Sequence, residues 1–321
     1  MHAQTVGIIG LKRMGASIGL ALKASPLELN VVGYDPYSGQ ARKAKDKYKA
    51  IDDGKWSVGK MADSADILIL TGESVDQEQT LETIGGRIQD HTLVIDLTGQ
   101  KGDGQAWAKA YFEQGYYIGG HIVLSADKLT DTRSGIEAAQ ADLFHNSIFC
   151  LSAAADLDPQ AIETAVAFGR MLGSTPYFLE ANEFDSLIQG VETVPGLLAA
   201  AMFTAVENAA GGRDMLRFAG QSFAQSVQPL ERGGDIADMA TRNQAATLRW
   251  MDALLEELTT IRGWVANGDT ELMNSTFNGM SLKRDEWLHE RAQNEWEEGE
   301  EETPEMPGIM QHLFGNLGKR K

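Results

Sequence analysis

The feature that most constrains the fold is an apolar segment that runs into a glycine-containing turn within the first fifteen residues. Thr5 to Ile9 has the pattern of a buried parallel strand, and Gly10 and Gly15 follow with the spacing of the first and third glycines in G-x-G-x-x-G. Apolar residues then recur at helical spacing, so the period changes where a strand–turn–helix unit requires it. This opening predicts a Rossmann-like fold that binds a dinucleotide.

The second glycine of that pattern is replaced by Lys12. A glycine there normally lets the backbone approach the pyrophosphate, and the Cβ of a lysine hinders that approach. The ammonium can offset part of the loss by pairing with a phosphate. We therefore expect weakened but surviving cofactor binding, with a cofactor loop formed by Gly10, Lys12, Arg13, Met14 and Gly15.

A second apolar strand, Leu29 to Tyr34, ends at Asp35, twenty residues after the last glycine of the turn. An acidic side chain there accepts hydrogen bonds from the ribose hydroxyls of adenosine and repels a 2′-phosphate, which favours NAD over NADP. The alternative is that Asp35 only starts a turn with Pro36. NADP also stays open, because Lys12 and Arg13 could admit a 2′-phosphate.

Composition and charge narrow the class of protein. A chain of 321 residues with 43% hydrophobic residues can bury a large core, and its length favours two domains. The net charge of −18 argues against binding to nucleic acid or to an anionic membrane. Cys150 is the only cysteine, which excludes an intramolecular disulfide and a cysteine-rich metal site. We expect a cytoplasmic protein, because no apolar run approaches the roughly eighteen residues of a membrane span and the first strand leaves no room for a signal peptide.

Strand-like and helical patterns alternate through residues 1–155, which predicts a doubly wound parallel sheet. The expected later strands are 65–70, 93–97, 116–119 and 147–151, and the expected helices are 75–88 and 105–114. Ligands of such sheets bind beyond the carboxyl ends of the strands. We therefore place Thr71 and Thr98 against the cofactor. The turn from Asp96 to Lys101 and the segment Gly119-Gly120-His121 are candidates for the active cleft.

Residues 156–290 change to a helical pattern and predict a second domain. A helix starts at Pro159 with Asp158 as its cap, and residues 175–179 suggest one more strand. Two long apolar helices follow over residues 182–208 and 236–267, the first with a kink at Pro195. Their stripes favour a helical homodimer interface, although an ordinary core explains them nearly as well.

The last segment, 291–321, is acidic and carries seven glutamates between residues 295 and 305. Such a run is typical of a solvated or flexible linker. Its apolar end, from Ile309 to Leu317, fits either a frayed terminal helix or a docking segment.

Several motifs occur in a characteristic order over residues 4 to 290. They are the glycine loop, Gly33-Tyr34-Asp35, the Asp96 to Lys101 turn, Gly119-Gly120-His121, the Ser-Gly-Ile-Glu-Ala-Ala-Gln-Ala-Asp-Leu-Phe segment of residues 134–144, Arg242-Asn243-Gln244 and Asn267-Gly268-Asp269. In the order and spacing of these motifs, the chain resembles the prephenate and arogenate dehydrogenases. The resemblance implies a nucleotide-binding domain, a helical dimerisation domain, and NAD- or NADP-dependent oxidative decarboxylation of a cyclohexadienyl substrate in tyrosine biosynthesis.

The resemblance also implies catalytic roles for His121, which aligns with the family's catalytic histidine, and for Lys101. An imidazole with a pKa near neutrality is suited to accept the hydroxyl proton as hydride leaves the same carbon. The alternative for His121 is a histidine that only satisfies a loop carbonyl.

The chain departs from the family pattern on the substrate side. Gly99 stands where the family has a serine, Ile122-Val123 where it has Pro-Met, and Glu192 where it has a histidine. Residues 220–227 hold no cation where the family has an arginine, and Arg213, Arg217 or Arg232 could substitute.

Burying a carboxylate without a cation costs several kcal/mol, so these losses weigh against prephenate itself. Three hypotheses follow: a dehydrogenase of a cyclohexadienyl substrate, an oxidoreductase acting on a less anionic small molecule, and a catalytically silent dimer that binds a dinucleotide.

Overall fold

A computed structural model describes residues 4–293 of the chain; residues 1–3 and 294–321 lie outside the described part. The contacts divide the chain into two units, residues 1–181 with the segment from 283 onward, and residues 182–282. The glutamates and the apolar end of the predicted acidic tail lie outside the described residues.

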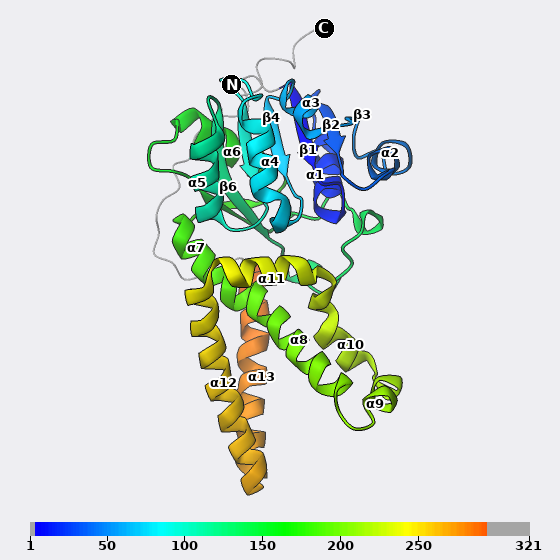
Figure 1. Ribbon diagram of the computed structural model, residues 1–321, viewed down its shortest axis with the longest axis vertical. Coiled ribbons are helices and arrows are strands. Elements are labelled where there is room, and N and C mark those ends of the chain that lie inside the picture. Colours follow the sequence, from blue (N-terminus) through cyan, green and yellow to red (C-terminus); the bar gives the residue numbers. More distant parts are fainter. Residues whose placement is uncertain (1–3, 294–321) are drawn as a thin grey trace. The chain divides into compact units, whose positions relative to one another are not determined.

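Eight strands form a single sheet within the described residues, in the order β3-β2-β1-β4-β5-β6-β7-β8 (Figure 1). Their bounds are β1 Thr5–Ile9, β2 Asn30–Tyr34, β3 Asp53–Gly54, β4 Ile67–Leu70, β5 Leu93–Asp96, β6 Tyr116–Val123, β7 Ile148–Ser152 and β8 Thr175–Phe178. All neighbouring pairs are parallel except β6 and β7, which are antiparallel. The prediction of a doubly wound, mainly parallel sheet is confirmed, and the difference is that β7 and β8 run opposite to the other strands.

Helices cover both faces of the sheet because its strands are apolar on both sides. On one face, α1 (Arg13–Ala24) and α6 (Pro159–Met171) pack against side chains such as Ile8 and Phe149. On the other, α3 (Val58–Ala62), α4 (Gln77–Gly85) and α5 (Lys101–Tyr111) pack against side chains such as Ile9 and Tyr117. The shorter helical segments of this unit are α2 (Gln40–Arg42), η1 (Lys43–Lys47), η2 (Ser74–Asp76), η3 (Ala126–Lys128) and η4 (Ile136–Ala138).

The first unit extends beyond residue 155, where the sequence predicted its end. Asp158 caps α6 by accepting the Gln160 amide at 2.7 Å, and Pro159 occupies the first turn, as expected. The helix then buries Phe168 against the sheet, and β8 pairs with β7. Residues 156–181 therefore belong to the sheet unit by their packing.

The second unit is helical, as predicted. Its elements are α7 (Ala181–Ile188), η5 (Gln189–Thr193), α8 (Val194–Glu207), α9 (Gly212–Phe218), α10 (Gln221–Val227), η6 (Gln228–Arg232), α11 (Gly233–Arg242), α12 (Gln244–Asn267) and α13 (Thr270–Gln293), of which α7 begins and α13 ends in residues of the first unit. The helix predicted over 182–208 contains a π-helical turn, η5, directly before Pro195. The helix predicted over 236–267 is broken at Asn243, whose side chain caps α12 by accepting the Ala246 amide.

One helical stretch, residues 181–207, is long and apolar enough to span a membrane by length and composition alone, with a mean hydropathy of 1.3. Its middle, however, contacts α11 and α12 and buries Gln189, whose side chain bonds to Thr247 and to the Met239 carbonyl. Its middle is therefore held by contacts within the helical unit, and 33% of its apolar window is buried.

Candidate active site

The glycine turn after β1 has the geometry that its pattern predicts. Gly10 has a φ of +92°, which L side chains rarely adopt, and its amide donates to the Tyr34 carbonyl at 2.9 Å. A Cβ on Gly15 would overlap the carbonyl oxygen of Gly10. Both positions therefore need glycine, the first for the turn and the second for close packing of α1 on β1.

Two other predicted cofactor residues meet this turn from neighbouring strand ends. The Thr71 hydroxyl, after β4, donates to the Gly10 carbonyl at 2.7 Å. The Asp35 carboxylate, after β2, accepts the backbone amides of Leu11 at 2.7 Å and Tyr37 at 2.9 Å. The carboxyl ends of β1, β2 and β4 thus bring Gly10, Asp35 and Thr71 together.

Lys12 fits the second-glycine position without backbone strain. It caps α1 with a φ of −74° and a ψ of −160°, an extended conformation open to any residue. Its ammonium bonds to the Glu73 carboxylate at 2.7 Å and lies over the Tyr37 ring, 5.2 Å from the centroid. Burial alone would lower the pKa of Lys12, but the hydrogen bond and the charge of Glu73 outweigh it and raise that pKa.

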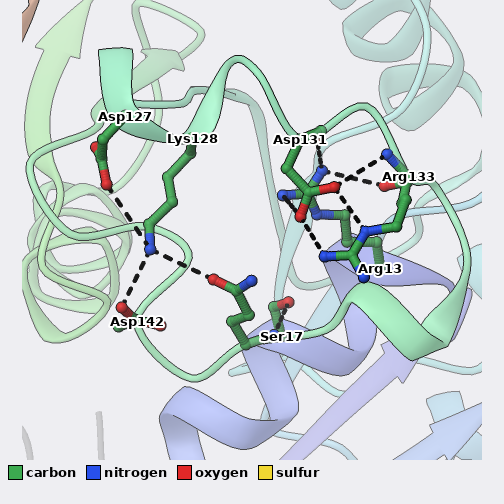
Figure 2. Close-up of polar contacts among 8 residues, drawn as sticks. Arg13, Ser17, Asp127, Lys128, Asp131, Arg133 and Asp142 are labelled. Carbon is green, nitrogen blue, oxygen red and sulfur yellow. Dashed lines mark hydrogen bonds and ion pairs between the residues drawn. The ribbon is translucent and has the colours of Figure 1, made fainter.

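Arg13 is committed to the protein itself, as Figure 2 shows. Its guanidinium is almost buried and donates to the carbonyls of Asp131 and Arg133, and it pairs with the Asp131 carboxylate at 3.4 Å. Its backbone amide donates to Ser134 at 3.0 Å. The sequence predicted a cofactor contact for Arg13, whereas these bonds direct the side chain to the segment after β6. Met14, its neighbour, is partly buried and packs against the apolar core.

The Asp131 carboxylate is the centre of this contact. Arg133 donates to both of its oxygens, at 2.7 Å each, and these hydrogen bonds hold the pKa of Asp131 far below its ordinary range. Further along the same segment, the backbone amide of Gln140 donates to the Ser17 hydroxyl of α1 at 3.0 Å. We call this set of contacts, from Arg13 and Ser17 to residues 131–140, the strap.

The turn after β5 is built around a fully buried carboxylate, Asp96. One oxygen accepts the amide and the hydroxyl of Thr98; the other accepts the Gln77 amide group at 2.7 Å and the Tyr117 hydroxyl at 3.0 Å. Thr98, predicted to contact the cofactor, is thus buried with its hydroxyl bonded to Asp96. Its cofactor contact stays a prediction.

Lys101, at the start of α5, lies under this turn and is only 1% exposed. Its ammonium donates to the carbonyls of Thr98 at 2.7 Å and Asp96 at 3.2 Å. Its aliphatic stem lies on Gly119 of β6, where a Cβ would come within 2.9 Å of the lysine Cδ. The lysine therefore fixes the turn against the strand that carries His121.

His121 lies inside β6, whereas the sequence placed it at a strand end, two residues beyond a strand expected over residues 116–119. The strand is longer because β7 pairs antiparallel with it, His121 opposite Cys150, and this pairing is not visible locally in the sequence. Its pairing with β5 ends at Gly119, so His121 stands beyond the carboxyl end of β5.

Side chains two residues apart in a strand, and cross-strand partners, share a face of the sheet. His121 therefore projects to the side where Lys101 lies on Gly119, together with Cys150. Burial raises the pKa of the Cys150 thiol to about 11, partly opposed by the charge of Lys101. The protonated thiol is a poor nucleophile, which leaves the imidazole as the group of this pair suited to proton transfer.

Gly99 explains one departure from the family pattern. It has a φ of +42°, and a Cβ there would overlap the side-chain oxygen of Gln77. Gln77 is buried and also bonds to the carbonyls of Thr98 and Gln100. The space that a serine would need is thus taken by Gln77, which the sequence did not indicate because nothing local links residues 77 and 99.

In the helical unit, the acidic residue at the position of a family histidine is neutralised. Glu192, in η5, pairs with Arg232 at 2.8 Å, and both side chains are about half exposed. Of the three arginines considered as substitutes for the missing cation, Arg232 thus already has a carboxylate partner. The neighbouring Thr193 hydroxyl is buried without a hydrogen-bond partner among the described residues.

The doubly wound sheet, the glycine turn and the acidic end of β2 define the class of fold as a Rossmann-type, dinucleotide-binding domain. Residues 18–175 match the family model described as "Prephenate dehydrogenase, nucleotide-binding domain". This match covers 158 of the 321 residues, and it supports the prephenate dehydrogenase family together with the relatives below. The matched residues begin after the glycine turn, so Lys12 lies outside them.

Individual relatives agree with this family. The prephenate dehydrogenase of Bacillus subtilis is 27% identical over 301 residues, which span 88% of this chain and 75% of the relative. The structure of A. aeolicus prephenate dehydrogenase with hydroxyphenyl propionate and NAD⁺ is similar with a TM-score of 0.76 at 19% identity, over 89% of this chain and 99% of that one. Synechocystis arogenate dehydrogenase gives a TM-score of 0.65 at 20% identity, over 88% and 100% of the two chains. At these identities the two structures support the fold.

Proposed function

We propose that this chain is an NAD-dependent dehydrogenase that oxidises the ring hydroxyl of a cyclohexadienyl substrate of the prephenate or arogenate type, with loss of carbon dioxide. The observation that carries the proposal is the position of His121. It lies beyond the end of β5, on the face occupied by Lys101, at the sheet edge that carries the glycine turn. The family of the chain supports the same reaction.

In this proposal His121 accepts the hydroxyl proton while the carbon that bears the hydroxyl gives up its hydride. A bound nicotinamide supplies the hydride acceptor. Release of carbon dioxide leaves its bonding electrons in the ring, which becomes aromatic. Lys101 acts beside the histidine by holding the Asp96 turn.

For the cofactor we propose NAD. Asp35 holds its carboxylate at the end of β2, and a 2′-phosphate placed there would meet that charge. The two cations of the turn already have carboxylate partners, Lys12 with Glu73 and Arg13 with Asp131. Neither Lys12 nor Arg13 is therefore an unpaired cation that a 2′-phosphate would meet.

A second candidate is oxidation of a less anionic small molecule. Glu192 stands at the position of a family histidine, and its partner Arg232 already neutralises a carboxylate. A substrate with fewer carboxylates would need fewer cations in the helical unit.

We further propose that the protein works as a cytoplasmic homodimer through its helical unit. Four exposed apolar side chains on α12 follow helical spacing: Leu248, Leu255, Leu258 and Val265. Monomeric proteins rarely leave such stripes in water. Sedimentation analysis tests this directly, with a dimer expected and a monomer at micromolar concentration contradicting it.

The first experiment is calorimetric titration with NAD and NADP, followed by turnover assays with prephenate and arogenate. We expect micromolar NAD binding and weaker NADP binding. His121→Ala should lower turnover at least a thousandfold, within the usual range for a general base, and leave NAD affinity within a few fold. His91→Gln, at the opposite edge of the sheet, is the matched control. Turnover unaffected by His121→Ala would remove this histidine from the mechanism, and failure of wild type to bind either cofactor would contradict the proposed function.

A further inference from the structure

Three side chains from three different strand ends meet above the glycine turn. Lys12 comes from the turn after β1, Tyr37 follows β2, and Glu73 follows β4. The Glu73 carboxylate accepts the Lys12 ammonium at 2.7 Å and the Tyr37 hydroxyl at 3.3 Å, and the same ammonium lies over the Tyr37 ring. We call these three residues the latch.

The latch lies where the charge of a dinucleotide would arrive. The residue at the second-glycine position of this turn is the one whose backbone faces the pyrophosphate, and in this chain that residue is Lys12. Glu73 is only two residues beyond Thr71, whose hydroxyl bonds to the Gly10 carbonyl. The ammonium and its carboxylate partner therefore both stand beside the cofactor turn.

The charges of the latch and of a dinucleotide compete. A pyrophosphate brings two negative charges, and Glu73 already supplies one to the same ammonium. Its hydrogen bond to Lys12 keeps the pKa of Glu73 below its ordinary value, so the carboxylate is ionised at neutral pH. A phosphate and this carboxylate repel each other when both approach Lys12.

We propose that Glu73 is an internal competitor of the cofactor: Lys12 exchanges the Glu73 carboxylate for the pyrophosphate when the dinucleotide binds, so the latch sets the cofactor affinity. This inference rests on the proposed binding of NAD. It gives the lysine at the glycine position a function of its own, and it makes Glu73 a residue that limits affinity rather than one that contributes to it.

The test compares NAD affinities of the full chain by calorimetry. Glu73→Gln should tighten NAD binding about two- to fivefold, the size that half-exposed ion pairs usually contribute, and should make binding more sensitive to salt. Lys12→Met should weaken binding by a similar factor. In the double variant the gain from Glu73→Gln should disappear, because the ammonium that it frees is gone.

The matched control is Asp63→Asn. Asp63 pairs with Arg87 at the same 2.7 Å, with a carboxylate 38% exposed against 40% for Glu73, but both partners precede their strands and lie at the other edge of the sheet. NAD affinity should be unchanged in this variant. Melting temperatures of all variants verify that they fold.

Three results would overturn the inference. Unchanged or weaker NAD binding by Glu73→Gln removes the competition, and a gain that persists beside Lys12→Met shows that Glu73 acts without Lys12. A gain for NADP that exceeds the gain for NAD assigns Lys12 to the 2′-phosphate instead. If wild type binds no dinucleotide, the proposed function fails; the competition then survives only if Glu73→Gln binds NAD, and is overturned if it does not.

Discussion

Two turns at the same edge of the sheet both need glycine, but the polar side chains beside them differ in exposure. Gly10, after β1, has a positive φ, and a Cβ there would come within 2.9 Å of Thr71, while the charged side chains of the latch beside this turn are about half exposed. Gly99, after β5, also has a positive φ, but the buried amide of Gln77 fills the space beside it. We call the first the open turn, because its charged neighbours are half exposed, and the second the closed turn, because its polar neighbours are buried. Residue type alone therefore does not tell whether a turn serves a ligand.

The largest effect is expected at the open turn, from Gly15→Ala. The new Cβ would overlap the Gly10 carbonyl, so α1 must move away from β1. We expect a loss of about 3 kcal/mol in the free energy of unfolding and of detectable NAD binding. Urea unfolding and calorimetry measure both. Gly86→Ala, where a Cβ meets open space, is the control, and equal stability of the two variants would show that the turn is not rigid.

An intermediate effect is expected at the closed turn. Gln77→Ala leaves the Asp96 carboxylate short of a donor and should cost about 1–3 kcal/mol. Gly99→Ser should cost a similar amount, because the serine meets Gln77 in a strained backbone.

The double variant at the closed turn sharpens the comparison. The two changes should cost at least about 1 kcal/mol less together than the sum of the single variants, since removing Gln77 makes room for the serine. Additive costs in urea unfolding would show that Gln77 does not occupy the serine's place.

The smallest effect is expected at the opposite edge of the sheet, where His91 bonds to Asp90 at 3.1 Å and Asp66 at 3.0 Å. Asp90 first, then Asp66, raise the pKa of His91 above its ordinary 6.5. The stabilisation is therefore complete below pH 6.5 and is lost as the pH rises through the higher folded pKa.

The melting temperature of wild type should exceed that of His91→Gln at pH 5.5, and the difference should shrink by pH 9. NAD affinity should be the same in both proteins. A difference that grows with pH would contradict the assignment of the protonated imidazole, and a change in NAD affinity would show that the two edges are coupled.

The sequence predicted those parts of the fold whose signals are local. The strand before Gly10, the strand before Asp35 and the cap of α6 at Asp158 depend on patterns within a few residues, and the structure has them at nearly the predicted positions. The extension of β6 through His121 depends instead on β7, about thirty residues later along the chain. The strand propensity of a short stretch of sequence does not show that β6 pairs with β7.

The candidate site also has residues with a local sequence signal and residues that only distant contacts reveal. The sequence predicted Gly10, Asp35 and Thr71 as cofactor residues, and the structure brings them together, while their contact with a cofactor stays a prediction. It missed Glu73 and Gln77, whose roles follow from Lys12 and Gly99 on other loops. Their partners are set by the order of the strands in the sheet, which periodicity does not report.

The strap has a consequence for how the chain is assembled. Arg13 finds its carbonyl partners 118 and 120 residues later in the sequence, after five of the strands and their crossover helices. Contacts between such distant residues close a long loop and form late in folding. During synthesis, the turn that begins at Gly10 emerges early. The amino end of α1, however, cannot form its hydrogen bonds through Arg13 until Ser134 has left the ribosome. The earliest part of the nucleotide site to be made is thus among the last parts to be finished.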